Sequence, residues 1–382
     1  MTNDSVPPDL IIIGGGVIGL SLADRALRDG LRVMVLDKST PGREASWAGA
    51  GMVTCRPRPR VREGIPDYHD LTLLAAKLYP EWTAQLKSET GIDTGYRVSG
   101  ALELLPPTLL DEEEQNIASL LAGGRERGMP VRRLDLLELR QREPGVNAEN
   151  FSGAIEYTTE GQVRSPWLVA ALLASIQKRG GIVESEAAVA DVMLSADSSR
   201  ATGVVLRSGR EIQAGAVAVC SGAWAAELPA LVKLAPACGK VHPVKGQLLC
   251  YNADPKLARR VMTCDKNYIV PRGDGIYLIG ATHELSGFEK TPTEEGREQL
   301  TKFAHALLPA LKSVTPIKSW AGLRPGIKGK HPLLGEVRST KRLFVACGHY
   351  RNGLTLAPAT AELLNAAIQC RETAVGIEAW RV

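Results

Sequence analysis

The sequence predicts an α/β fold in two domains: a Rossmann-like domain assembled from discontinuous segments, and an α+β domain built on a mostly antiparallel β-sheet. Three observations support this prediction. A buried strand runs into a glycine-rich turn at Gly14, a second strand-to-glycine turn follows much later at Gly222, and residues 229–322 are rich in alternating strand patterns. With 382 residues, the chain also exceeds the usual size of a single domain.

The N-terminal segment has the pattern of a βαβ unit. Residues 10–13 are apolar and mostly β-branched, which is typical of a buried parallel strand, and they lead directly into the glycine turn 14–19. Apolar residues then recur at helical spacing as far as Gly30, and a second strand over 32–36 ends at Asp37. This order of strand, glycines, helix, strand and acid predicts a dinucleotide-binding site.

Each glycine of the turn has its own expected role. Gly14 permits the tight turn, Gly16 lets a pyrophosphate approach the backbone, and Gly19 allows the helix to pack closely on the strand. The positive N-terminal end of the helix faces the phosphate charge, and Asp37 is placed to accept hydrogen bonds from the adenosine ribose. This pattern leaves both NAD and FAD open as the dinucleotide.

The segment 42–52 favours FAD. It consists largely of small residues and directly follows the ribose-binding strand, as expected where backbone amides must approach a long cofactor. The alternative is a flexible surface loop, but Trp47 and Met52 are unusual in a solvated linker.

The chain returns to the Rossmann-like domain twice. A strand over 216–220 ends in the turn that contains Gly222, and an apolar strand over 343–346 leads toward a helix over about 354–368. Pro358 fits this helix only in its first turn, and the positive N-terminal end suits the negative charge of a reduced flavin. The expected FAD-binding domain comprises 1–94, 147–228 and 323–382, and the expected substrate-binding domain comprises 95–146 and 229–322.

The charge balance argues against a nucleic-acid partner. Lys and Arg number 46 against 42 Asp and Glu, which gives a formal net charge of +4. One run of alternating basic residues comprises Arg56, Arg58, Arg60 and Arg62. Because it lacks interleaved aromatic residues, we interpret it as a solvated loop. An active-site lid and a subunit contact are the alternatives.

Membrane, secreted and metal-binding classes are disfavoured as well. The uncharged stretch 10–23 is interrupted by glycines and shorter than the roughly 20 residues of a membrane helix. No basic region precedes it and no cleavage site follows it, so we expect a cytoplasmic protein. The seven cysteines are an odd number and contain no C-x-x-C pair, so the sequence does not predict a disulfide framework. The histidines do not have the spacing of metal ligands, so it does not predict a metal site either.

Short motifs along the chain are far more restrictive than the glycine turn: R-E-A-S-W-A-G-A-G-M (43–52), Y-I-V-P-R (268–272), G-A-T (280–282), G-L-R-P (322–325), and G-H-Y-R-N-G (348–353) running into L-A-P-A-T (356–360). Together they resemble the D-amino-acid oxidase and sarcosine oxidase superfamily of flavoproteins, most closely its ThiO-type glycine oxidase branch of thiamin biosynthesis. The resemblance covers nearly the whole chain.

The resemblance implies a set of catalytic and substrate-pocket residues. Arg324 binds the substrate carboxylate, for which a guanidinium is suited because it stays charged and can form two parallel hydrogen bonds. Tyr268 adds a hydroxyl hydrogen bond, and Arg351 serves substrate, flavin or loop structure. Met52 and His283 fall at pocket positions. For His283, a direct substrate role and an exposed histidine at a strand end both stay open.

The resemblance also implies non-covalent FAD. In sarcosine oxidases a cysteine carries the flavin covalently, and residues 322–334 contain none. Besides Gly14, Gly16, Gly19 and Gly222, the residues that match FAD-contacting positions are Val17, Ile18, Asp37, Lys38, Ala45, Ser46, Ala50, Gly51, Met52, His349, Tyr350, Arg351, Asn352, Gly353, Leu354 and Thr355, together with Val189, which meets the adenine through its backbone.

The implied reaction is the oxidation of glycine to its imino acid. A hydride passes from the α-carbon to the flavin, and O2 then reoxidises the flavin and yields hydrogen peroxide, so that positioning rather than a protein nucleophile supplies most of the rate. The alternatives are an oxidase or dehydrogenase of the same fold that acts on sarcosine, a D-amino acid or proline, and a flavin-binding protein without turnover. Relatives of this kind suggest a homo-oligomer, either a dimer or a tetramer.

Overall fold

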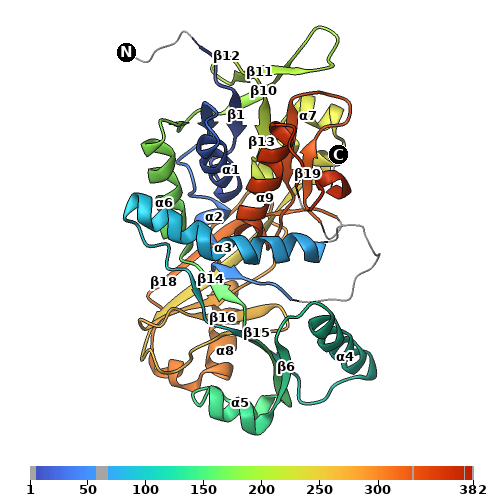
Figure 1. Ribbon diagram of the computed structural model, residues 1–382. Coiled ribbons are helices and arrows are strands. Elements are labelled where there is room, and N and C mark those ends of the chain that lie inside the picture. The colour runs from blue at the N-terminus through green and yellow to red at the C-terminus, as the bar shows by residue number, and fades with distance from the viewer. Residues whose placement is uncertain (1–5, 57–67, 329–330, 374, 381–382) are drawn as a thin grey trace.

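The computed structural model describes residues 6–56, 68–328, 331–373 and 375–380, and these form two lobes (Figure 1). One lobe contains a six-stranded sheet with helices on one face, and the other contains an eight-stranded sheet. The first is largely parallel and the second largely antiparallel. This arrangement confirms the predicted α/β fold class.

The six-stranded sheet has the order β19-β20-β13-β1-β2-β9. β1 pairs in parallel with β2 and β13, β2 with β9, and β13 with β20, while β19 runs antiparallel to β20. The sheet therefore gathers strands from the beginning, middle and end of the chain, as the sequence predicted. The bounds are β1 Leu10–Ile13, β2 Val33–Leu36, β9 Ile182–Glu184, β13 Val217–Val219, β19 Leu333–Glu336 and β20 Leu343–Cys347.

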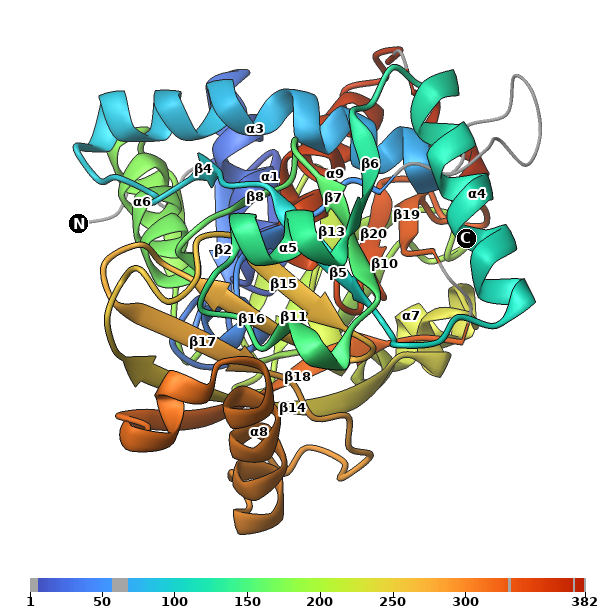
Figure 2. The ribbon, with the colours of Figure 1, turned by 90° about the horizontal axis from the view of Figure 1, so that it is seen from below.

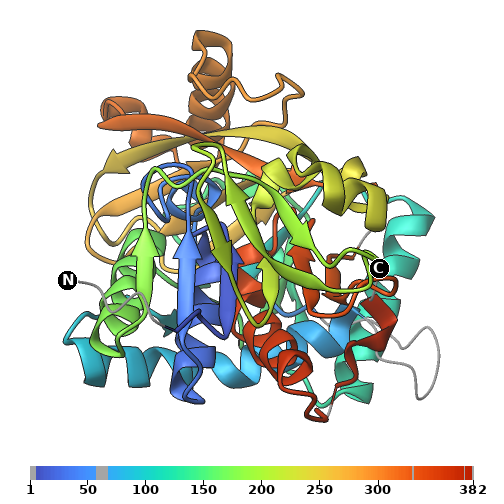
Figure 3. The ribbon, with the colours of Figure 1, turned by 90° about the horizontal axis from the view of Figure 1, so that it is seen from above.

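Both faces of this sheet are buried, which explains the uninterrupted apolar run of β1. Leu10 and Ile12 pack into the core below the helices, whereas Ile11 and Ile13 pack against a three-stranded sheet on the other face (Figure 3). The helices are α1 Val17–Arg28, α3 Tyr68–Thr90, α6 Ser165–Lys178 and α9 Gly353–Ile368, and the opposite layer comprises β10 Val189–Leu194, β11 Ala201–Leu206, β12 Glu211–Gln213 and α7 Pro229–Leu234.

The eight-stranded sheet has the order β18-β14-β17-β16-β15-β5-β7-β6, and its pairs are antiparallel except for β15 with β5. Helices α5 and α8 cover one of its faces (Figure 2). The bounds are β5 Ala101–Leu105, β6 Val131–Asp135, β7 Gly153–Tyr157, β14 His242–Asn252, β15 Val261–Cys264, β16 Asn267–Pro271, β17 Ile276–Gly280, β18 Lys318–Gly326, α4 Asp111–Glu126, α5 Leu136–Arg142 and α8 Glu294–Leu307.

Two of the expected domain boundaries do not coincide with this sheet. The expected FAD-binding segment 147–228 includes β7, yet β7 pairs on both sides with strands of the other lobe. The expected boundary at residue 323 falls inside β18, which pairs with β14 along its whole length. We therefore propose that residues 153–157 and 323–326 belong structurally to the substrate-binding domain.

A small sheet joins the two lobes. It has the order β3-β8-β4, with β3 Met52–Val53, β8 Gly161–Gln162 and β4 Arg97–Val98. β3 continues the small-residue loop, whose short helix is α2 Ala45–Ala48. Short 3-10 helices complete the described elements: η1 Ala148–Asn150, η2 Gly222–Glu227, η3 Cys238–Lys240, η4 Pro309–Ser313 and η5 Ile377–Trp380.

The C-terminal helix α9 accommodates its proline differently from the prediction. Because α9 begins at Gly353, Pro358 lies beyond the first turn and cannot donate to the carbonyl of Leu354. The buried Tyr79 hydroxyl donates to that carbonyl instead, with an O–O distance of 2.6 Å. A tertiary contact from α3 thus replaces the backbone hydrogen bond that proline removes, and the expectation that Pro358 must lie in the first turn was wrong.

None of the described helices combines the length and hydrophobicity that a membrane span requires. Within the same described residues, no group of three or more His, Cys, Asp or Glu side chains is arranged to hold a metal ion. All seven cysteines are free thiols.

Candidate functional site

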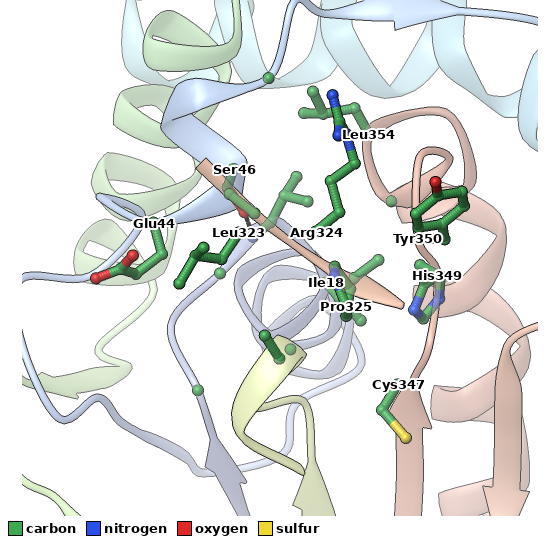
Figure 4. Close-up of a pocket in the computed structure, with 18 of the residues that line it drawn as sticks. Ile18, Glu44, Ser46, Leu323, Arg324, Pro325, Cys347, His349, Tyr350 and Leu354 are labelled. Carbon is green, nitrogen blue, oxygen red and sulfur yellow. Dashed lines mark hydrogen bonds between the residues drawn. The ribbon is translucent and has the colours of Figure 1, made fainter. Parts of the chain in front are cut away.

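A cavity of about 1040 Å³ lies where the two large sheets meet. Its wall includes Ile13, Cys220 and Cys347, which stand at the carboxyl ends of three neighbouring parallel strands, and Arg324 from β18 of the other sheet. The carboxyl edge of a parallel sheet is where open α/β folds bind their ligands. Figure 4 shows how Arg324, Ser46 and Tyr350 approach this space from different elements.

Most of the site residues that the sequence predicted line this one cavity. The structure brings together Gly14, Gly16, Val17, Ile18, Asp37, Lys38, Ala45, Ser46, Ala50, Gly51, Met52, Val189, Gly222, Tyr268, Arg324, His349, Tyr350, Arg351, Asn352, Gly353, Leu354 and Thr355. Gly19 and His283 are the two predicted residues outside the lining.

The glycine turn has the geometry that a close phosphate approach requires. Gly14 has a φ of +105°, and a Cβ there would lie 2.5 Å from the carbonyl oxygen of Cys220. At Gly19 a Cβ would overlap the carbonyl oxygen of Gly14. Gly19 therefore acts through packing, by letting α1 begin directly under the turn, and it does not reach the cavity itself.

Asp37 organises the turn in addition to lining the cavity. One of its carboxylate oxygens accepts a hydrogen bond from the backbone N–H of Gly15 at 2.7 Å, and the other accepts from Ser39 at 2.9 Å. A carboxylate has further acceptor capacity, so these bonds are compatible with the expected contact to a ribose. Beside it, Lys38 lies over the ring of Trp224, with Nζ 3.6 Å from the ring centroid.

The small-residue loop is fixed to its surroundings, which excludes the alternative of a flexible surface loop. The Ser46 hydroxyl accepts a hydrogen bond from the N–H of Val17 at 2.8 Å and so ties the loop to the first turn of α1. Gly51 has a φ of +70°, and a Cβ there would overlap the carbonyl oxygen of Val163. The loop backbone therefore stays close to the cavity.

The C-terminal loop directs the N-terminus of α9 at the cavity. Thr355, in the first turn of α9, donates to the carbonyl of Met52 at 3.2 Å, which joins the helix to the small-residue loop. His349 is buried, with Nε2 3.1 Å from the Thr360 hydroxyl, and burial lowers the pKa of His349 to about 3. The imidazole is therefore neutral at ordinary pH and contributes no charge to the cavity.

The substrate-binding residues expected from the motifs lie side by side. Tyr268 and Arg324 are within hydrogen-bonding reach of each other. Burial and the positive charge of Arg351 lower the pKa of Arg324, and burial raises the pKa of Tyr268 despite the nearby arginines. Among the residues that the structure describes, Arg324 hydrogen-bonds only to carbonyl oxygens and to this tyrosine, so its charge has no carboxylate partner.

Two glycines that the motifs did not single out for these roles make room for the pair. A Cβ at Gly246 would overlap the Arg324 guanidinium, and a Cβ at Gly280 would overlap the Tyr268 ring. Both glycines lie within strands, where an isolated glycine often marks close approach by another group. That signal was present in the sequence, but it did not identify which side chain approaches.

The structure corrects the expectation of a pocket position for His283. The side chain is exposed and outside the cavity lining, with its ring centroid 6.4 Å from that of Tyr350. The two rings are arranged edge to face. The polarity of the described cavity wall comes instead from other side chains, including Arg56 and Lys266.

Arg56 is not part of a solvated loop, contrary to our interpretation of the basic run. Its guanidinium forms ion pairs with Glu103 at 2.8 Å and Glu160 at 3.3 Å and lies over the Tyr157 ring. Although burial opposes it, the charge of these carboxylates raises the pKa of Arg56. The other members of the run, Arg58, Arg60 and Arg62, lie outside the described residues.

Comparison with known proteins identifies the family. Residues 9–367 match the model of the family described as FAD dependent oxidoreductase. The chain belongs to this family. It is 36% identical over 365 residues to a glycine oxidase of Pseudomonas aeruginosa, covering 95% of each protein. It is also 34% identical over 368 residues to a bifunctional protein ThiO/ThiG of Trichormus variabilis, covering 93% of this chain and 52% of that protein.

A solved structure agrees with this assignment. The crystal structure of glycine oxidase from Geobacillus kaustophilus superposes with a TM-score of 0.88 at 32% identity, covering 98% of both chains. This FAD-dependent oxidoreductase thus shares its fold with a glycine oxidase over 98% of its length. The family resemblance inferred from the short motifs is confirmed.

The described residues of this FAD-dependent oxidoreductase fit the cofactor. Gly14 and Gly51 let the backbone of the wall pack closely on neighbouring carbonyl groups, and the N-terminus of α1 offers backbone N–H groups to a pyrophosphate. Val189 and Asp37, the residues expected to meet the adenosine, both line the cavity, and so do the first residues of α9. These groups would hold FAD without a covalent bond.

Proposed function

We propose that this protein oxidises glycine to its imino acid, with O2 as the electron acceptor and hydrogen peroxide as the second product, as a step of thiamin biosynthesis. When bound, FAD supplies the two-electron redox chemistry. The similarity to glycine oxidases and to a ThiO/ThiG protein supports the substrate and the pathway.

The single observation that carries the proposal is the environment of Arg324. A guanidinium on the wall of a cavity, with no carboxylate partner among the described residues, is suited to bind a carboxylate ligand through two charge-assisted hydrogen bonds. Tyr268 lies within reach to add a hydroxyl donor. A substrate carboxylate held this way would fix the adjacent α-carbon and amine relative to the cofactor, and such positioning can supply a large part of the rate.

Arg324 and Arg351 also favour the reactive state of the substrate amine. Positive charge near a bound ammonium group lowers its pKa, because like charges disfavour the protonated form. Burial strengthens this effect by reducing the solvation of the ammonium. We propose that the amine is therefore held neutral, as required for oxidation of its carbon–hydrogen bond.

An anaerobic titration tests the substrate. The purified FAD-loaded protein is mixed with glycine, sarcosine, D-alanine or proline, and loss of the oxidised-flavin absorbance is followed. Preferential reduction by glycine, with return of the absorbance and release of peroxide on admission of O2, is the expected result. Preferential reduction by a larger amine would assign a different substrate, and reduction without rapid reoxidation by O2 would assign a dehydrogenase. Absence of reduction by any of them would indicate a protein without this turnover.

We also propose, from the resemblance, that the protein acts in the cytoplasm as a homo-oligomer. Light scattering coupled to size-exclusion chromatography of the FAD-loaded protein measures the oligomeric state, with a dimer or tetramer expected. A monomer at micromolar concentration would contradict this part of the proposal.

A further inference from the structure

A second, smaller cavity lies behind the wall of the first. It has a volume of about 250 Å³ and is lined by arginines from three separate segments: Arg97 in β4, Arg164 directly before α6, and Arg272 directly after β16. We call it the arginine pocket. Its other lining residues are Asp93, Gly95, Tyr96, Gln162 and Trp167.

The arginine pocket has more positive charge than its carboxylates balance. Arg164 forms an ion pair with Asp274, while Asp93 is paired with Lys87 at 2.6 Å. Among the described residues, neither Arg97 nor Arg272 hydrogen-bonds to a carboxylate. Two guanidinium charges thus remain without an anionic hydrogen-bond partner.

Carbonyl oxygens hold these two guanidinium groups in place. Arg97 donates to the Pro271 carbonyl at 2.7 Å, and the buried Arg272 donates to the carbonyls of Val163 at 3.0 Å and Ala50 at 2.7 Å. Carbonyl acceptors satisfy N–H groups but do not neutralise a charge. Burial, with the positive charges of Arg164 and Arg97, accordingly lowers the pKa of Arg272.

The backbone is shaped around the arginine side chains. A Cβ at Gly95 would lie 2.8 Å from Cγ of Arg164, and a Cβ at Gly273 would overlap Nη1 of Arg97. Both glycines have positive φ angles, of +67° and +79°. Arg164 also lies against the Trp167 ring, 4.4 Å from its centroid. The guanidinium groups are therefore positioned before any ligand arrives, which lowers the entropic cost of binding.

We propose that the arginine pocket binds a small phosphate-bearing anion, and that its occupancy is transmitted to the flavin cavity through Arg272. A phosphate group carries close to two negative charges near neutral pH, which suits two guanidinium groups that have no carboxylate hydrogen-bond partner among the described residues. Arginine forks bind phosphate oxygens in pairs, and several forks can share one phosphate. Inorganic phosphate and a small phosphate ester present the same group to the pocket.

Two routes of contact connect the arginine pocket with the flavin cavity. Arg272 lines the pocket and donates to the carbonyl of Ala50, which lines the cavity. Tyr96, also in the pocket, stacks on Tyr79 with ring centroids 5.1 Å apart. Tyr79 in turn holds the carbonyl of Leu354 at the N-terminus of α9. An anion that changes the position of the Arg272 or Tyr96 side chain would therefore shift the carbonyl of Ala50 or of Leu354, both of which belong to residues that line the flavin cavity.

Calorimetric titration of the FAD-saturated protein with inorganic phosphate tests the site directly. Saturating FAD fills the nucleotide's own phosphate site, and sodium chloride keeps the ionic strength constant. We expect one saturable site per chain. Arg97→Gln and Arg164→Gln should each weaken phosphate binding by about 10-fold or more, because each removes a charge-assisted contact. The matched control Arg133→Gln, at an exposed arginine paired with Glu114, should bind phosphate normally.

Two results would overturn the proposed site. One is the absence of a saturable binding heat when the native protein is titrated with phosphate, and the other is equal phosphate affinity in the native protein and in both FAD-loaded variants.

A second titration, with phenyl phosphate, distinguishes the two ligand classes. Binding at least as tight as that of inorganic phosphate identifies a phosphate ester as the natural ligand class, whereas weaker binding identifies inorganic phosphate. The flavin absorbance band, recorded during the titration, tests transmission, and a spectrum that stays constant through saturation would overturn that part. These readouts require no turnover, so they are independent of the proposed oxidase activity.

Discussion

The Arg324 side chain is defined by what surrounds it: a glycine backbone, two carbonyl oxygens and a tyrosine hydroxyl. We expect Arg324→Leu to lower kcat/KM for glycine by about 100-fold or more, since two charge-assisted hydrogen bonds are lost. Arg324→Lys should retain the positive charge but lose the paired hydrogen bonds, so its kcat/KM should lie between that of the native protein and that of Arg324→Leu. Peroxide release at varied glycine concentration measures this, with FAD content as the control. An unchanged kcat/KM in Arg324→Leu would remove the residue from the substrate site.

Gly246 offers a gentler test of the same site. A Cβ at this position would overlap the Arg324 guanidinium, but the end of a long side chain can move aside. Gly246→Ala should therefore change the free energy of unfolding by less than about 1 kcal/mol while raising KM for glycine several-fold. Gly376→Ala, where a Cβ meets no atom within 4 Å, is the matched control and should change neither quantity. Equal kinetics in the two variants would contradict the assigned role of the guanidinium.

His349 makes stability depend on pH. The folded protein holds its imidazole neutral down to about pH 3, whereas in the unfolded chain the group takes up a proton below about pH 6.5. Between these values the unfolded state binds more protons, so stability falls as the pH falls. From pH 7 to pH 5 this one group should cost about 2 kcal/mol of unfolding free energy.

Urea unfolding at pH 7 and pH 5, with FAD in excess, measures the His349 contribution. The loss of stability on acidification should be smaller in His349→Asn than in the native protein by about 2 kcal/mol. The control is His242→Asn, which changes an exposed histidine and should lose as much stability between pH 7 and pH 5 as the native protein. If His349→Asn also lost as much stability as the native protein, the buried imidazole would not be the source of the pH dependence.

The role of a residue could be predicted where a short sequence motif indicates it. Arg324 and Tyr268 were identified from motifs, and both line the cavity. The partners of Arg56 could not be predicted, because Glu103 and Glu160 lie 47 and 104 residues away along the chain. The exposed position of His283 also depends on how the loop after β17 turns, which its sequence does not specify.

At the level of elements, the pairing of α3 with α9 is the contact most open to test. Tyr79→Phe removes the donor for the Leu354 carbonyl and should destabilise the protein by about 1–3 kcal/mol. Pro358→Ala restores a backbone N–H that can donate to the same carbonyl. The double variant should therefore recover most of the stability lost in Tyr79→Phe.

Urea unfolding of the native protein, Tyr79→Phe, Pro358→Ala and the double variant gives the coupling free energy between the two substitutions. A coupling free energy close to the loss in Tyr79→Phe is expected, since each variant supplies or removes a donor for one shared acceptor. Strictly additive effects would show that the Tyr79 hydroxyl does not substitute for the missing N–H of Pro358.

Elements with local signals were predictable, and their pairing partners were not. The pattern of 10–37 contains the strand, turn and helix of the first βαβ unit, and the structure reproduces all of them. The sequence did not identify β7, whose pairing with β5 and β6 is set by long-range packing. The expected boundary at residue 147 therefore left β7 in the FAD-binding domain, and its pairing supports our proposal to place residues 153–157 in the substrate-binding domain.

For the whole molecule, FAD is expected to act as a structural component. Its cavity is lined by both lobes, so a ligand that binds only the folded state stabilises both together. Free FAD at 100 times its Kd should add about 2.7 kcal/mol to the unfolding free energy. Thermal unfolding of the FAD-free protein at increasing FAD measures the shift. Flavin mononucleotide, which lacks the adenosine that would reach Val189, should give a smaller one. Equal shifts from the two flavins would contradict the placement of the adenosine.

The origin of the cavity walls also sets the order of events during synthesis. Along the chain, Gly14 is made before Asp37, Val189 and Gly222, and Thr355 follows all of them. A growing chain in which α9 has not yet been made lacks the part of the cavity wall that residues 353–355 supply. We therefore expect FAD to bind tightly only after α9 has been synthesised, and the FAD-free protein to be more open to proteolysis than the FAD-loaded one.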